Sequence, residues 1–99
     1  MAQIEIDHNA LAHFCRANKI AKLALFGSVL RDDFAPQSDV DVLVEFEPGK
    51  EPGLFGIARM EREMLPFFGG RKVDLRTSGD LGRYMRDRVL KTAEGIYAA

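Results

Sequence analysis

The groups best suited to chemistry lie in residues 26–46, FGSVLRDDFAPQSDVDVLVEF. A Gly-Ser pair, Gly27 and Ser28, is followed by two aspartates in an Asp-x-Asp arrangement, Asp39 and Asp41. Clustered carboxylates repel one another, and an unpaired carboxylate is costly to bury. We therefore expect a positive charge beside these aspartates in addition to that of Arg31.

The alternation of side chains along two strands predicts where the carboxylates point. Residues 39–46, DVDVLVEF, form the clearest strand of the sequence, with its valines on one face and Asp39 and Asp41 on the other. In the later segment RKVDLRT, Val73 and Leu75 alternate with Asp74 in the same way. If both apolar faces pack under helices and the strands lie near each other, all three aspartates emerge on the opposite face.

Three converging carboxylates form a site of hard oxygen ligands, which suits Mg²⁺ or Mn²⁺. Two such ions about 4 Å apart can hold the attacking and leaving oxygens of a phosphoryl or nucleotidyl transfer. Asp39 and Asp41 could share one ion, and Asp74 would complete the site of a second. The metal would supply the missing positive charge. The competing interpretations are a polar strand face turned to solvent and, for Asp74, a surface ion pair with Arg71 or Arg76.

The Gly-Ser pair has properties that suit a phosphate group. Gly27 follows the apolar strand IAKLALF, and a residue without a Cβ lets a phosphate approach the backbone closely. Ser28 would offer its N–H and hydroxyl at the start of a short helix, where an anion is favoured. The pair could equally be an ordinary helix N-cap after a turn.

The remaining sequence predicts alternating helices and strands. Helices are expected at 7–19, at 54–67 and at about 80–93; Asp7 or Asn9 would cap the first, and Thr77 or Ser78 would cap the last. Strands are expected at 20–26, 39–46 and 71–77. One or two helical turns are expected at 28–33, and a turn around Pro36. This order predicts one α/β domain over residues 1–99, with a sheet covered by helices.

Composition narrows the functional class. The 99 residues are 46% hydrophobic and 29% charged, with a formal net charge of −1, as in ordinary soluble globular proteins. The chain has no excess of basic residues of the kind that favours nucleic-acid binding, so we do not expect it to bind nucleic acid directly. No apolar run reaches the length of a membrane span, and the single cysteine, Cys15, cannot form an internal disulfide. We expect a cytoplasmic protein in which Cys15 is a small buried apolar residue.

The motifs together match the pattern of a known superfamily. Gly27-Ser28, ten further residues and then Asp39-Val40-Asp41 resemble the signature of the DNA polymerase beta-like nucleotidyltransferases, and Asp74 looks like their third carboxylate. For so short a chain the closest match is the minimal nucleotidyltransferase (MNT) family, the antitoxin half of HEPN/MNT toxin–antitoxin pairs. The resemblance runs from about residue 21 to the C-terminus. The chain departs from the frequent GSxARGD pattern, because Leu30 and Asp32 replace alanine and glycine.

The resemblance implies a small mixed-sheet nucleotidyltransferase core, the palm of DNA polymerase beta-like enzymes, with helices packed on one face. It implies transfer of AMP from ATP to a hydroxyl group with release of pyrophosphate, assisted by two Mg²⁺ ions. Asp39 and Asp41 would bind the metal on the triphosphate, and Asp74 would bind the metal at the acceptor. Gly27 and Ser28 would hold the phosphates. Arg31 would either bind a phosphate or neutralise the two aspartates that follow it.

The resemblance also implies an acceptor. It would be a tyrosine of a HEPN toxin, a small helical ribonuclease that the modification silences, and this chain would be the antitoxin. Two other functions stay open: an antitoxin that neutralises its toxin by binding alone, and a small-molecule nucleotidyltransferase of the aminoglycoside-modifying kind. A basic set on the last predicted helix is expected to face solvent or, alternatively, a nucleotide or acidic partner; it comprises Arg83, Arg86, Arg88 and Lys91.

Overall fold

The structure is a computed structural model that describes residues 5–30 and 38–99. Its elements, in chain order, are α1 (His8–Ala17), β1 (Ile20–Phe26), the 3-10 helix η1 (Gly27–Leu30), β2 (Val40–Phe46), α2 (Leu54–Glu63), the 3-10 helix η2 (Leu65–Phe68), β3 (Val73–Arg76), the 3-10 helix η3 (Ser78–Asp80), α3 (Arg83–Thr92) and β4 (Glu94–Ala98). Arg31 and the turn expected around Pro36 lie outside the described residues.

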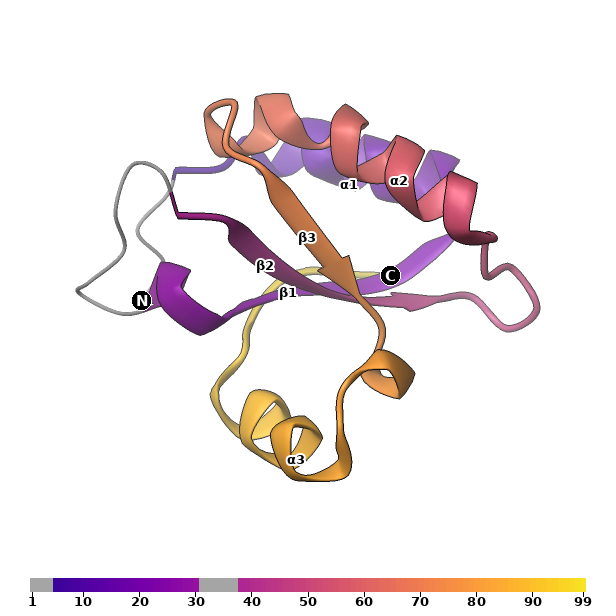
Figure 1. The fold of residues 1–99 in the computed structure, drawn as a ribbon. Coiled ribbons are helices and arrows are strands. Elements are labelled where there is room, and N and C mark those ends of the chain that lie inside the picture. Colours follow the sequence, from indigo (N-terminus) through magenta and orange to yellow (C-terminus); the bar gives the residue numbers. More distant parts are fainter. Residues whose placement is uncertain (1–4, 31–37) are drawn as a thin grey trace.

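In the described ranges the strands form one four-stranded sheet in the order β3-β2-β1-β4. β1 runs antiparallel to both β2 and β4, whereas β2 and β3 are parallel, so the sheet is mixed as expected. The strand β4 was not expected from the sequence. It pairs with β1 and forms the sheet edge opposite β3 (Figure 1).

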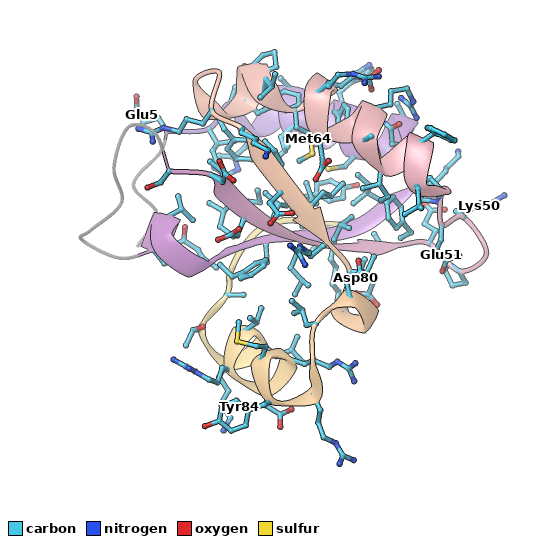
Figure 2. The ribbon with its side chains drawn as sticks, viewed as in Figure 1. Glu5, Lys50, Glu51, Met64, Asp80 and Tyr84 are labelled. Atoms are coloured by element: carbon cyan, nitrogen blue, oxygen red, sulfur yellow. The ribbon has the colours of Figure 1, made fainter. Side chains whose placement is uncertain are left out.

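The two helices α1 and α2 cover one face of the sheet (Figure 1). The predicted sidedness of β2 is confirmed, because its valines and Phe46 are buried in the core beneath these helices. Met64, at the end of α2, points toward the sheet (Figure 2), and Cys15 of α1 is fully buried. Burial raises the pKa of the Cys15 thiol to about 12, which agrees with its expected role as an apolar core residue.

The third helix, α3, lies on the opposite side of the sheet from α1 and α2 (Figure 1). The expectation that the helices pack on one face of the sheet is therefore right for α1 and α2 and wrong for α3. The reason is a second apolar cluster, in which Val89 of α3 and Leu81 pack with Phe26 at the end of β1. Leu43 of β2 packs against this cluster. Leu43 has the strand parity of Asp41, so α3 covers part of the face that carries the aspartates.

Local chemistry sets the ends of the helices. The carboxylate of Asp7 accepts hydrogen bonds from the backbone N–H groups of residues 9 and 10, both at 3.1 Å, so Asp7 is the cap of α1. The helix expected at 54–67 ends earlier as an α-helix, because Pro66 has no N–H to donate, and the chain continues as η2. The helix expected from Asp80 is divided, since Thr77 and Asp80 form a capping box around η3 before α3 begins.

No helix in the described part of the chain is both long and apolar enough to span a bilayer.

Candidate active site

The parallel pairing of β2 and β3 sets Asp41 beside Asp74. The two residues are Cα partners in the register, and neighbouring strands lie about 4.8 Å apart. Each lies between buried apolar neighbours along its strand, so each projects to the face opposite α1 and α2. We call this side of the sheet the carboxylate face.

Asp39 lies one residue before the start of β2 and is exposed. The register thus brings Asp41 and Asp74 together, while Asp39 directly precedes the first residue of β2. Within residues 5–30 and 38–99, no three acidic, histidine or cysteine side chains are grouped closely enough to hold a metal ion.

Gly27 approaches Asp41 closely. Phe26 is the register partner of Asp41, so Gly27 follows directly after the paired residue. A Cβ atom built on Gly27 would collide with Oδ2 of Asp41 and lie 3.3 Å from its Cγ. The φ angle of Gly27 is +76°, in the left-handed region that favours glycine. The φ angle favours glycine here, and a larger residue would also have to displace the Asp41 carboxylate. Ser28 is the second residue of η1.

Arg76 forms a two-point ion pair with Asp74. Its Nε–H donates to Oδ1 at 3.1 Å and its Nη2–H donates to Oδ2 at 3.2 Å. The Asp74 side chain is 33% exposed and that of Arg76 is 47% exposed. The pKa of Arg76 is raised, first by the hydrogen bond to Asp74 and then by its charge, with smaller contributions from the charges of Asp80 and Asp41.

Arg76 is therefore a positive charge beside the carboxylates. The sequence predicts Arg76 on the face of Asp74, because it follows Asp74 by two residues on the same strand, but only as a competing ion-pair partner and not as the expected counter-charge.

The donor set of the carboxylate face has the chemistry of a site for a hard divalent cation. Asp41 and Asp74 offer carboxylate oxygens from adjacent strand positions, and both residues are partly accessible. Mg²⁺ usually takes one or two protein carboxylates and completes its shell with water and phosphate oxygens. The pair formed by the register supplies these two carboxylates, whereas Asp39 is not grouped with them in the described structure.

Comparison with known proteins identifies the family. The model of the family described as "Nucleotidyltransferase domain" matches residues 9–95. The chain belongs to this nucleotidyltransferase family. It is 32% identical over 77 residues to MJ0435 of Methanocaldococcus jannaschii, which is named as a protein adenylyltransferase, and the match covers 78% of this chain and 80% of MJ0435.

Solved structures share the fold of this nucleotidyltransferase. One is a minimal nucleotidyltransferase with a TM-score of 0.69 and 30% identity, over 87% of this chain and 85% of that chain. Another is a toxin–antitoxin structure with AMP-PNP, which has a TM-score of 0.73 and 17% identity, over 95% of this chain and 75% of that chain. The expected superfamily and the minimal nucleotidyltransferase fold are confirmed.

One member of the basic set on α3 of the nucleotidyltransferase has a structural role. Nε–H of Arg86 donates to the carbonyl of Ser78 at 2.9 Å, and its Nη2–H donates to the carbonyl of Leu81 at 3.4 Å. Arg86 thereby ties η3 and the segment after it to α3. Arg83, Arg88 and Lys91 are exposed.

Proposed function

We propose that this nucleotidyltransferase transfers AMP from ATP to a hydroxyl group of a partner protein. The observation that carries the proposal is the register of Asp41 with Asp74 on the carboxylate face, with Gly27 packed against Asp41. The likeness to a relative named as a protein adenylyltransferase supports a protein acceptor, and the fold shared with a toxin–antitoxin structure holding AMP-PNP supports an adenine nucleotide.

The residues of the carboxylate face take separate roles in this proposal. Asp39 and Asp41 would hold an Mg²⁺ ion with the triphosphate, and Asp74 would hold a second on the acceptor side. Bound Mg²⁺ would supply charge neutralisation and lower the pKa of the acceptor hydroxyl. Gly27 leaves room beside Asp41, and the backbone of η1 from Ser28 onward contacts the phosphates, with Arg31 as a further phosphate ligand.

The reaction is a displacement at the α-phosphorus. The acceptor oxygen forms a bond to that phosphorus, the bond to the bridging oxygen of pyrophosphate breaks, and the hydroxyl proton passes to solvent. The acceptor is a tyrosine of a HEPN-type toxin, which makes this chain the antitoxin of the pair. The likeness to a toxin–antitoxin structure is the support for this partner.

The first test measures incorporation of labelled AMP from ATP into a co-purified HEPN toxin in the presence of Mg²⁺. Asp39→Asn combined with Asp41→Asn should abolish incorporation while the chain stays folded, because neither residue belongs to the buried core. The exposed Glu51, between β2 and α2, provides the control, since Glu51→Gln removes one carboxylate outside both these strands and α3. Toxin neutralisation that survives the double substitution without any AMP incorporation would favour an antitoxin that acts by binding alone.

Asp74→Asn separates transfer from nucleotide binding. An acceptor-side ligand acts on the attacking group, so its loss should lower kcat strongly and change the KM for ATP little. A purely structural ion pair between Asp74 and Arg76 predicts near-normal transfer instead. Rates of AMP incorporation at varied ATP concentration decide between these outcomes, and an unchanged kcat would remove Asp74 from the catalytic set.

A further inference from the structure

The two-point pair between Asp74 and Arg76 engages both oxygens of the carboxylate. Nε–H and Nη2–H of Arg76 each reach a different oxygen of Asp74, at 3.1 and 3.2 Å. This is the geometry in which a guanidinium binds a carboxylate most strongly. A metal ion that approaches Asp74 therefore meets a carboxylate already occupied by a cation.

The position of Arg76 keeps that cation within the site. Arg76 is the last residue of β3, two residues after Asp74, and its Cα partner on β2 is Leu43. Leu43 lies two residues beyond Asp41 on the same face, so the guanidinium projects from the sheet beside both aspartates. Its side chain is 47% exposed and can turn toward solvent without unpacking the core.

We propose that Arg76 is an internal counter-ion that holds Asp74 in the resting protein and must release it before Asp74 can bind a metal ion. The proposal rests on the proposed function, because it matters only if Asp74 is a metal ligand. Arg76 is a positioning residue in this scheme. It weakens binding of the acceptor-side ion and leaves the ion at Asp39 and Asp41 less affected.

The test measures Mn²⁺ binding to the full chain in the presence of ATP, by electron paramagnetic resonance of free Mn²⁺. Arg76→Gln should tighten the weaker Mn²⁺ site about two- to fivefold, the range expected when an exposed ion pair is removed. Lys72→Gln is the matched control, because Lys72 is an exposed cation two residues before Asp74 and has the same strand parity. It should change the affinity much less.

A second comparison separates competition at Asp74 from general electrostatics. If Arg76 acts through Asp74, Arg76→Gln should bring no gain in affinity when Asp74→Asn is already present. A gain that persists in that background, or an equal gain from Lys72→Gln, would overturn the proposal. Urea unfolding checks that each variant is folded. If Arg76→Gln does not fold, Arg76→Lys takes its place in the Mn²⁺ measurement. Arg76→Lys keeps the charge but not the two-point geometry, so its gain in affinity should be smaller.

The outcome also distinguishes this proposal from the proposed function. If the unmodified chain with ATP binds no more Mn²⁺ than the Asp39→Asn and Asp41→Asn double variant, the metal site itself is wrong and both proposals fail. If the unmodified chain binds Mn²⁺ and Arg76→Gln brings no gain, the role of Arg76 alone is wrong.

Discussion

At the scale of single residues, the close approach between Gly27 and Asp41 has the clearest physical cause. Two requirements meet at Gly27: a φ angle of +76° and the absence of a Cβ where the Asp41 carboxylate lies. The first requirement recurs at Gly49, where φ is +75°, but an added Cβ there would meet nothing within 4 Å. Comparing substitutions at Gly27 and Gly49 therefore separates the cost of the backbone conformation from the cost of displacing the Asp41 carboxylate.

Gly27→Ala should therefore destabilise the chain more than Gly49→Ala. The backbone cost of a left-handed alanine is about 1–2 kcal/mol in both variants. Gly27→Ala adds the collision with Asp41, so it should also weaken ATP binding, whereas Gly49→Ala should not. Urea unfolding and ATP titration of both variants check this expectation. Equal losses of stability with unchanged ATP affinity would mean that Asp41 moves aside freely and that its position is not critical.

At the scale of elements, the edge strand β3 carries Asp74 and needs its own support. It pairs with β2 on one side only, and on the other side the backbone N–H of Leu75 donates to Oε2 of Glu61 at 2.8 Å. Glu61 comes from α2, so this hydrogen bond ties the helix on one face of the sheet to the strand that positions Asp74. The bond is partly buried, which makes its loss more costly than that of an exposed contact.

Glu61→Ala should lower the free energy of unfolding by about 1–2 kcal/mol, because the N–H of Leu75 loses its charged acceptor. Glu63→Ala is the matched control on the same helix. Its carboxylate pairs with Arg59 at 2.8 Å, and both side chains are 46% exposed, so its loss should cost at most about 0.5 kcal/mol. Equal costs in urea unfolding would show that the Glu61 contact does not support β3.

The sequence was sufficient for the elements whose side chains alternate strongly. Valines that alternate with aspartates placed Asp41 and Asp74 on the correct face without any tertiary information. The pairing of Asp41 with Asp74 required more, because the register of parallel strands depends on contacts far apart in sequence. β4 was missed because Glu94–Ala98 is short, contains Gly95 and is only partly buried, so its pattern is weak before β1 is in place to pair with it.

At the scale of the whole molecule, the two faces of the sheet differ. α1 and α2 cover the core face, whereas α3 lies on the carboxylate side (Figure 1). Under the proposed function, a protein acceptor would have to bring its hydroxyl to Asp41 and Asp74 and would therefore contact the molecule on the side of α3. This helix presents large apolar side chains to solvent, and Tyr84 projects away from the sheet (Figure 2) with 79% of its surface exposed.

We therefore expect α3 to contribute to docking of the acceptor protein that the proposed function requires. The same helix carries the exposed cations Arg83, Arg88 and Lys91, which favour an acidic region on the partner. Tyrosine is a frequent interface anchor, so Tyr84→Ala should weaken the complex with the HEPN toxin about tenfold. ATP affinity and stability should stay unchanged, because Tyr84 is largely exposed and is not part of either apolar cluster.

Phe55→Ala is the matched control for this last prediction. Phe55 is a 95% exposed aromatic residue in the first turn of α2, the helix that covers the other face of the sheet. Its truncation removes a comparable apolar surface without touching the carboxylate side, so it should leave toxin affinity and AMP incorporation unchanged. Calorimetric titration of the toxin with each variant measures the difference. A larger loss with Phe55→Ala than with Tyr84→Ala would place the partner on the α2 side, from which its hydroxyl could not approach Asp74 directly.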